Sequence, residues 1–302
     1  AVAYEGAVAV SIPIVKALRE GLTANRIEWV AGIINGTTNF ILSKMRDEGV
    51  DFAQALAQAQ ALGYAEADPT FDIEGIDAAH KITLLAANAF GMPVRFADAQ
   101  VEGITRLQGL DVACAEQLGY RIKLLGIAKR RPEGIELRVH PSLVPSKRLI
   151  ANVEGAMNAV LVQGDAVGAT LYYGKGAGSE PTASSVIADV VDITRLATAD
   201  PEHRVPYLAF QPNALSDLKV LPISEVFTSY YLRMRVEDKP GVLADVTKIL
   251  AEFSISIDAM LQKEPAEGES RTDIIMLTHQ TQEKNVDAAI ARIEALASVT
   301  GK

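Results

Sequence analysis

The sequence of 302 residues has a single cysteine, Cys114, so a disulfide-bonded scaffold is excluded. A lone thiol is typical of a reducing compartment, and we therefore expect a cytoplasmic protein. The few histidines are scattered and give no Cys/His spacing of a zinc site. No apolar run approaches the roughly 18 residues that span a bilayer, and no basic segment precedes an apolar one at the N-terminus. We expect neither a membrane partner nor a secretory signal.

The chain also has little positive charge. Its 29 Lys and Arg are outnumbered by 38 Asp and Glu, which gives a net charge of −9. Without a basic stripe, a nucleic-acid partner is not expected. No Gly-x-Gly-x-x-Gly, P-loop or Gly-x-Ser-x-Gly motif occurs, so any dinucleotide site within these residues is incomplete. With 49% hydrophobic residues, the chain is nevertheless long and apolar enough for two folded domains.

Hydrophobic periodicity and turn residues predict an α+β fold for the first 200 residues, with helices and strands intermixed. We expect helices over 12–22, 40–48, 52–62, 76–90, 111–118 and 182–198. We expect strands over 26–34, 101–106, 121–129, 135–139, 157–164 and 168–173. Residues 64–74, which contain Pro69, are expected to form a loop.

Residues 201–226 are rich in proline and predict a linker. Residues 227–302 follow as a compact unit, with strands expected over 229–236, 256–263 and 272–278 and helices over 241–253 and 285–297. This β-α-β-β-α order is typical of the ferredoxin-like plan, in which we expect the last strand, near Val299, to be short or lost.

An acidic segment, residues 64–81, contains the densest chemistry. It carries several carboxylates and no basic residue before His80. Asp77 and Lys81 are four residues apart and therefore share a helix face, where a lysine beside a carboxylate is suited to proton transfer. A solvated acidic loop with an ordinary helical ion pair is the simpler interpretation of the spacing alone. Pro69 and Gly75, however, favour a fixed loop shape around the carboxylates.

Two glycine-containing turns precede predicted helices. Gly36-Thr37-Thr38-Asn39 offers N–H groups and hydroxyls that suit a carboxylate or phosphate, although simple helix capping explains it as well. Gly174-x-Gly-x-Gly178 is similar to a phosphate-binding loop, but a glycine-rich loop alone is weak support for one. Cys114 lies on an apolar helix face and is expected in the core rather than as a nucleophile.

Together these segments resemble the homoserine dehydrogenase family. The resemblance is carried by IPIVKALREGL (12–22), IINGTTNFILSKM (33–45), LGYAEADPTFDIEGIDAAHKITLLA (62–86) and GKGAGSEPTASSVIADVVDI (174–193). It covers residues 4–196, and VEDKPGVL (236–243) resembles the ACT domain. It implies an NAD(P)-dependent oxidoreductase of threonine, methionine and isoleucine biosynthesis that interconverts L-aspartate-4-semialdehyde and L-homoserine. Most of the family's N-terminal Rossmann domain lies outside these residues, so we expect this chain alone to be inactive.

The resemblance also implies roles for individual residues. Lys81 matches the catalytic lysine, with Asp77 beside it. The residues that match substrate-binding positions are Glu66, Asp72, Tyr64, Gly36 and Thr37. Those that match positions near the cofactor are Gly63 and Gly178. A monovalent cation, sodium, is implied at Glu5, Val8, Val10 and Ile12, but the two glycines usual in that loop are replaced here by Val10 and Ser11.

The C-terminal unit is expected to bind a regulatory amino acid. Asp238-Lys-Pro-Gly241 predicts a tight turn into a helix, whose N–H groups and positive dipole suit a ligand carboxylate. The expected effector residues are Asp238, Gly241, Val242 and Leu243, and the ligand implied by the resemblance is L-threonine, giving feedback control of a homodimer or homotetramer. Two alternatives stay open: a dimerisation unit without a ligand, and a non-catalytic amino-acid-binding module.

Overall fold

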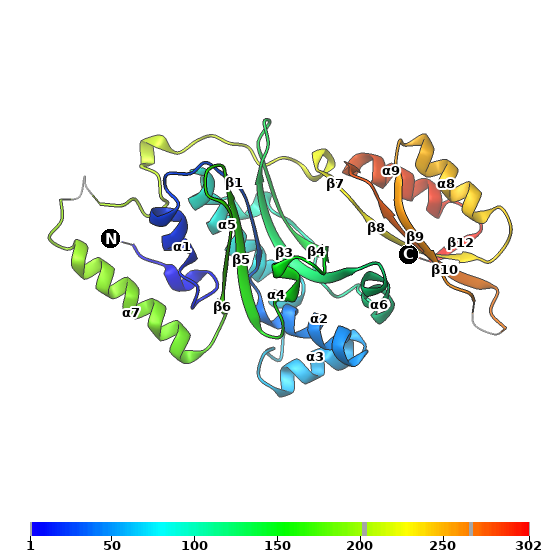
Figure 1. The fold of residues 1–302 in the computed structure, drawn as a ribbon, viewed down its shortest axis with the longest axis horizontal. Coiled ribbons are helices and arrows are strands. Elements are labelled where there is room, and N and C mark those ends of the chain that lie inside the picture. The colour runs from blue at the N-terminus through cyan, green and yellow to red at the C-terminus, as the bar shows by residue number, and fades with distance from the viewer. Residues whose placement is uncertain (1, 201–203, 266–267, 302) are drawn as a thin grey trace. The chain divides into compact units, whose positions relative to one another are not determined.

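Figure 1 shows the fold in a computed structural model, which describes residues 2–200, 204–265 and 268–301. The chain divides into two compact units, Ala1–Val220 and Leu221–Lys302. Their boundary falls inside the predicted linker. In the described parts of the chain, none of the helices has the length and apolar character to cross a membrane.

The first unit is built on a six-stranded sheet with the order β2-β4-β3-β1-β5-β6. Every pairing in it is antiparallel except the parallel pairing of β2 with β4. The strands are β1 (Ile27–Ile33), β2 (Gln100–Val101), β3 (Tyr120–Arg130), β4 (Ile135–Pro145), β5 (Met157–Gly164) and β6 (Gly168–Lys175). Together with its helices this sheet gives the predicted α+β fold.

Helices cover one face of this sheet and bury the main hydrophobic core against it. The helices of the unit are α1 (Ile14–Lys16), α2 (Gly36–Glu48), α3 (Phe52–Ala61), α4 (Thr70–Ile73), α5 (Ile76–Phe90), α6 (Gly109–Gln117) and α7 (Ser179–Leu196). Helix α7 adds no residue to this core and packs against the turn at Glu5–Ala7. Short 3₁₀ turns lie at Glu5–Ala7, Phe96–Asp98, Leu149–Asn152, Pro212–Ala214 and Ile223–Glu225. Helix α5 has the predicted bounds because Gly75 and Gly91, with φ of 79° and 63°, take up left-handed conformations at its two ends.

Several predicted elements differ from the structure. The strand expected over 135–139 continues to Pro145 as β4, and the helix expected over 40–48 begins at Gly36 as α2. The helix expected over 12–22 is α1 followed by a π-helical turn, Ala17–Gly21, in which the amide of Leu22 bonds the carbonyl of Ala17. The loop expected over 64–74 contains the single turn α4. The strand expected over 101–106 ends after Val101, because the chain at Gly103 presses on the Ile73 carbonyl so closely that a Cβ would lie 2.3 Å from it.

Part of the predicted linker packs against the first unit. The Phe210 ring lies over Gly91, the Ser216 amide donates to the Gly91 carbonyl (2.6 Å), and the Ile135 amide donates to the Lys219 carbonyl (2.8 Å). Residues 201–203 of that stretch lie outside the described residues. The segment is therefore attached to the first unit along much of its length.

The second unit has the predicted ferredoxin-like plan. Its elements are β7 (Phe227–Thr228), β8 (Tyr231–Glu237), α8 (Val242–Glu252), β9 (Ile257–Gln262), β10 (Arg271–Thr278), β11 (Thr281–Gln282), α9 (Glu283–Glu294) and β12 (Val299–Gly301). The main sheet has the order β12-β8-β10-β9 and is antiparallel throughout. The final strand is short, as expected. The unit has a hydrophobic core of its own, which includes Val246, Ile274 and Met276.

Candidate active site

The turn from β1 into α2 forms the base of the candidate site, and Asn35 organises it. Asn35 is the N-cap of α2, and its side-chain oxygen accepts from the amide of Thr38 (2.9 Å). Its amide nitrogen donates to the carboxylates of Asp72 (2.7 Å) and Asp77 (2.8 Å). One buried amide thus satisfies the helix end and holds two carboxylates that come from later in the chain.

Lys81 and Asp77 lie side by side on α5, as their spacing predicts. The Lys81 ammonium donates to Asp77 (2.7 Å) and to the carbonyl of Ile34, the last residue before the cap (3.1 Å). The two side chains are 20% and 19% exposed, so the pair borders solvent without being open to it. The Asp77 carboxylate is therefore shared between Lys81 and Asn35, which fixes the ammonium beside the N-terminal turn of α2.

The acidic loop folds over this turn. The Thr37 hydroxyl donates to the Tyr64 carbonyl (2.6 Å), and the Tyr64 ring lies 4.7 Å from that of Phe40. Asp72 joins through Asn35, whereas Glu66 is exposed, two residues along the chain from Tyr64. Asp68 has a local task instead, since it accepts from the amide and hydroxyl of Thr70 at the start of α4.

The structure therefore brings together most of the predicted catalytic and substrate residues. Those joined by direct contacts or through Asn35 are Thr37, Tyr64, Asp72, Asp77 and Lys81. Gly36 occupies the same turn and packs against the segment at Ala156. A Cβ on Gly36 would lie 2.8 Å from the Ala156 carbonyl oxygen. Glu66 and Gly63 lie on the adjoining loop. No atom lies within 4 Å of the position that a Cβ on Gly63 would take.

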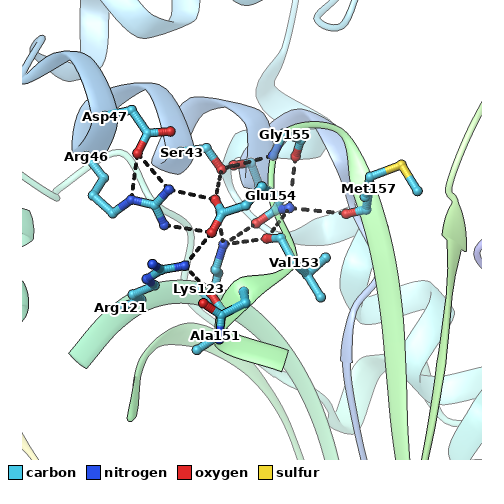
Figure 2. Close-up of polar contacts among 12 residues, drawn as sticks. Ser43, Arg46, Asp47, Arg121, Lys123, Ala151, Val153, Glu154, Gly155 and Met157 are labelled. Carbon is cyan, nitrogen blue, oxygen red and sulfur yellow. Dashed lines mark hydrogen bonds and ion pairs between the residues drawn. The ribbon is translucent and has the colours of Figure 1, made fainter. Parts of the chain in front are cut away.

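A buried polar cluster supports the α2 turn from behind (Figure 2). The Asn39 amide donates to the carbonyls of Val153, Gly155 and Met157 at 2.8–3.1 Å and so holds the 153–157 turn that backs Gly36. Lys123, 1% exposed, donates to the Asn39 side chain (3.0 Å) and to the Val153 carbonyl (2.6 Å). Lys123 on β3 thus lies next to the end of β1, where the chain turns into α2.

Lys123 lies at the edge of a network of ion pairs. Glu154 lies 3.8 Å from Lys123 and also pairs with Arg46 and Arg121, while Arg46 pairs with Asp47. Burial lowers the pKa of Lys123 to about 8 against the opposing attraction of Glu154. Burial alone would raise the pKa of Glu154, but the hydrogen bond from Arg46 and the nearby positive charges bring it below its usual value.

The glycine-rich segment, residues 174–178, leads into α7. Gly178 is the N-cap of that helix with φ of 124°, a conformation that glycine adopts most readily. The Lys175 carbonyl accepts from the amide and hydroxyl of Ser11 (3.2 and 2.7 Å). Gly176 lies against the side chain of Asn158 on β5, next to the turn that backs Gly36. The predicted cofactor and substrate segments therefore approach each other across β5.

The second unit has a cavity of about 400 Å³ at the turn between β8 and α8. It is lined by Val236, Glu237, Asp238, Lys239, Pro240, Gly241, Val242, Leu243, Gln262 and Ile274. All four predicted effector residues are in this lining. Gly241, with φ of 96°, is the N-cap of α8, so the first N–H groups of the helix lie at the cavity wall.

Comparison with known proteins identifies the family. Residues 13–191 match the homoserine dehydrogenase family, and residues 230–298 match the ACT domain. A homoserine dehydrogenase from Pseudomonas aeruginosa is 61% identical over 300 residues, which are 99% of this chain and 69% of that protein. The chain belongs to the homoserine dehydrogenase family. A relative from Neisseria gonorrhoeae is 57% identical over 98% of this chain and 68% of its own length.

Solved structures of the family agree. The crystal structure of a homoserine dehydrogenase from Thiobacillus denitrificans has a TM-score of 0.94 and 69% identity, covering 99% of this chain and 68% of that one. A hyperthermophilic archaeal homoserine dehydrogenase in complex with NADPH has a TM-score of 0.55 and 29% identity, covering 63% of this chain and 55% of that one. The chain thus spans about two thirds of the length of the Pseudomonas, Neisseria and Thiobacillus proteins.

The predicted cation loop forms hydrogen bonds within the chain. Both carboxylate oxygens of Glu5 accept hydrogen bonds from backbone amides at the start of α1, those of Val15 (2.9 Å) and Lys16 (2.8 Å), and the Val10 carbonyl accepts from the Ser185 hydroxyl. Burial raises the pKa of Glu5, and these two bonds oppose the rise. These bonds hold Glu5 at the start of α1, and the sodium ion implied at Glu5, Val8, Val10 and Ile12 stays a prediction. Among the described residues there is no group of three or more His, Cys, Asp or Glu side chains that could hold a metal ion.

Sequence reasoning for this homoserine dehydrogenase chain missed two contributors. Asn35 is not among the site residues predicted from the sequence, although its position directly before Gly36-Thr37 is a usable signal. Lys123 had a weaker signal, a lysine within the apolar strand RIKLLGIA. Its burial depends on partners 30 to 84 residues away and could not be read locally.

Proposed function

We propose that this chain provides the substrate site of an NAD(P)-dependent homoserine dehydrogenase that interconverts L-homoserine and L-aspartate-4-semialdehyde. The observation that supports it is the contact between Lys81 and Asp77, at the N-terminal turn of α2. An ordinary surface ion pair would not share its carboxylate with a buried helix cap such as Asn35. Family membership supports the choice of reaction.

The substrate's charges match the residues around Lys81. The substrate ammonium would be bound by the carboxylates of Glu66 and Asp72, which explains the excess of acid in this loop. The first N–H groups of α2, at Gly36 and Thr37, would bind its carboxylate, because the helix terminus is positive. Tyr64 closes this side of the site through its carbonyl, held by Thr37. The reacting carbon would then lie next to Lys81.

When bound, the nicotinamide cofactor supplies the hydride to the aldehyde carbon, or accepts it in the reverse direction. In reduction the Lys81 ammonium donates a proton to the aldehyde oxygen, which becomes the hydroxyl of homoserine. In oxidation the Lys81 amine takes that proton back. Asp77 keeps the nitrogen at one position throughout, and Gly63 and Gly178 are the proposed residues of this chain near the cofactor.

The second unit would bind a regulatory amino acid, L-threonine, in the cavity at Asp238 and Gly241. The homodimer or homotetramer implied by the resemblance stays a prediction, as does the sodium ion, through which we route no step.

The test uses two proteins. The first is the chain itself, and the second is the chain joined to the third of the Pseudomonas aeruginosa relative that it does not match, here named the completed enzyme. The chain alone should give background rates with homoserine and either nicotinamide cofactor, and the completed enzyme should turn over. Turnover by the chain alone, or none by the completed enzyme while the Pseudomonas enzyme is active, would contradict the proposal.

Lys81→Ala in the completed enzyme should lower kcat by roughly two to four decades, the range for a positioned acid or base. Homoserine binding should change far less. The matched control is Lys147→Ala, which removes an exposed lysine that follows β4. If the kcat of Lys81→Ala stays within a few-fold of that of the unsubstituted completed enzyme, Lys81 is only an ion-pair partner of Asp77 and the prediction is wrong.

A further inference from the structure

Asn158 on β5 is a buried amide whose hydrogen-bonding groups are unused. Its exposed fraction is 0%, and neither its Nδ2 nor its Oδ1 has a hydrogen-bond partner among the described residues. Buried amides are nearly always hydrogen-bonded, because leaving them unpaired is costly. An amide with both atoms unpaired therefore indicates a partner that the chain itself does not supply.

The position of Asn158 joins the two halves of the candidate site. Ala159 pairs with Ile33 on β1, so Asn158 lies beside Ile34, whose carbonyl accepts from Lys81. On its other side Asn158 pairs with Gly174 on β6, at the start of the glycine-rich segment. The amide therefore lies between the substrate turn and the segment that the family resemblance assigns to the cofactor.

Gly176 covers the amide in a specific way. A Cβ built at Gly176 would lie 2.2 Å from Nδ2, 2.3 Å from Cγ and 2.4 Å from Oδ1 of Asn158. Because these three distances are nearly equal, the glycine faces the flat side of the amide group. The N–H and lone-pair directions lie in the amide plane, so this glycine does not occupy them.

We propose that Asn158 binds the carboxamide of the nicotinamide ring, an assignment that rests on the proposed function. A carboxamide accepts and donates in one plane, so a single carboxamide satisfies both atoms of a primary amide at once. Homoserine's carboxylate only accepts and its ammonium only donates, so neither of these charged groups satisfies both atoms by itself. The ring must also lie next to the substrate carbon beside Lys81, and Asn158 lies beside the carbonyl that Lys81 contacts.

Because the amide is covered here, the glycine-rich segment has to shift when the ring binds. Three of its five residues are glycine, and Lys175 and Ala177 are exposed. Its first two residues, Gly174 and Lys175, are held in the sheet against Asn158 and Met157, and the Gly178 carbonyl accepts from Thr182. The shift is therefore confined to Gly176 and Ala177, which lie between these fixed points.

The binding test is made on the completed enzyme with Asn158→Ala. We expect the dissociation constant of NADPH, measured by its fluorescence without substrate, to rise roughly tenfold, as two neutral hydrogen bonds allow. The rise should be smaller for a cofactor whose carboxamide is replaced by an acetyl group, which lacks the N–H donor. The KM for homoserine should change less than twofold. Equal losses for both cofactors, or a larger loss for homoserine, would overturn the assignment.

A stability test on the 302-residue chain separates this role from a structural one. The matched control is Asn88, also a buried amide but one that donates to the Leu84 carbonyl (2.9 Å) and the Tyr4 hydroxyl (3.0 Å). Asn158→Ala should lower Tm by less than Asn88→Ala, since it removes no hydrogen bond. A larger fall would mean that the amide is bonded within the chain and would contradict the proposal. A completed enzyme that binds no nicotinamide cofactor would instead refute the proposed function.

Discussion

At the scale of single residues, the acidic loop divides into carboxylates with different tasks. Asp72 and Asp77 accept hydrogen bonds from Asn35, and Asp68 starts α4. The Glu66 side chain is exposed on the same loop, close to Tyr64 in sequence. These differences follow from the partner that each carboxylate meets, not from its chemistry. A substitution that replaces one carboxylate by its amide can therefore be compared with the corresponding substitution at another carboxylate of the same loop.

Glu66→Gln in the completed enzyme should raise the KM for homoserine by about 10-fold or more. The change keeps the side-chain shape but removes the charge that we propose for the substrate ammonium, a contact worth about 1.5–3 kcal/mol. The cofactor's KM should stay within twofold. Asp68→Asn is the control, because Asp68 bonds Thr70 in the same loop and should leave the KM unchanged. Equal rises in both KM values for Glu66→Gln would point to a general loss of structure instead.

At the scale of elements, α2 connects the buried charges to the substrate turn. Its first turn carries Gly36 and Thr37, and Asn39 one turn later holds the 153–157 segment and the ammonium of Lys123. The helix is thus fixed at the end that would contact substrate. The cost is a lysine whose charge is buried, which disfavours folding unless the lysine is neutral.

Stability should therefore depend on the protonation of Lys123. Its pKa is about 8 in the folded chain and near 10.4 when unfolded, so between these pH values the unfolded chain binds more protons and stability rises with pH. The Lys123 contribution should rise by roughly 3 kcal/mol across that window. Urea unfolding at pH 7–10.5 checks it. The stability of Lys123→Met relative to the original chain should be greatest below pH 8 and decline above it, whereas parallel profiles would contradict the prediction.

At the scale of the whole molecule, the two units have separate cores and separate candidate ligands. The first holds the Lys81 site, and the second holds the cavity at Asp238. A ligand in the second unit regulates the first only if it favours one state of the protein over another. Binding and regulation are therefore tested separately.

Calorimetry should detect L-threonine binding to the 302-residue chain. Asp238→Asn should weaken this binding by about tenfold or more, because Asp238 lines the cavity and is the carboxylate that we propose for the ligand ammonium. Asp258→Asn, on β9 of the same unit and outside the lining, is the control. In the completed enzyme threonine should lower the rate. If threonine gives no heat with the chain and no inhibition, the unit is a dimerisation module without this ligand.

Most element positions follow from local sequence signals. The bounds of α5 follow from its apolar period and its flanking glycines, and the ferredoxin-like order of the second unit follows from alternating short segments. The strand expected over 101–106 was wrong, because contact between Gly103 and Ile73 ends it, and these residues are distant in sequence. A pattern read over a few residues contains no information on such a contact.

The sequence by itself determined the pairing of Asp77 with Lys81, since residues four apart on a helix meet whatever surrounds them. It also determined the family, because the motifs are contiguous. Only the tertiary structure decided that Asn35 meets carboxylates 37 and 42 residues later, that Lys123 is buried against Asn39, and that Asn158 lies unpaired beneath Gly176. Burial and hydrogen-bond partners arise from the packing of strands and helices that are far apart in the chain, so no local pattern specifies them.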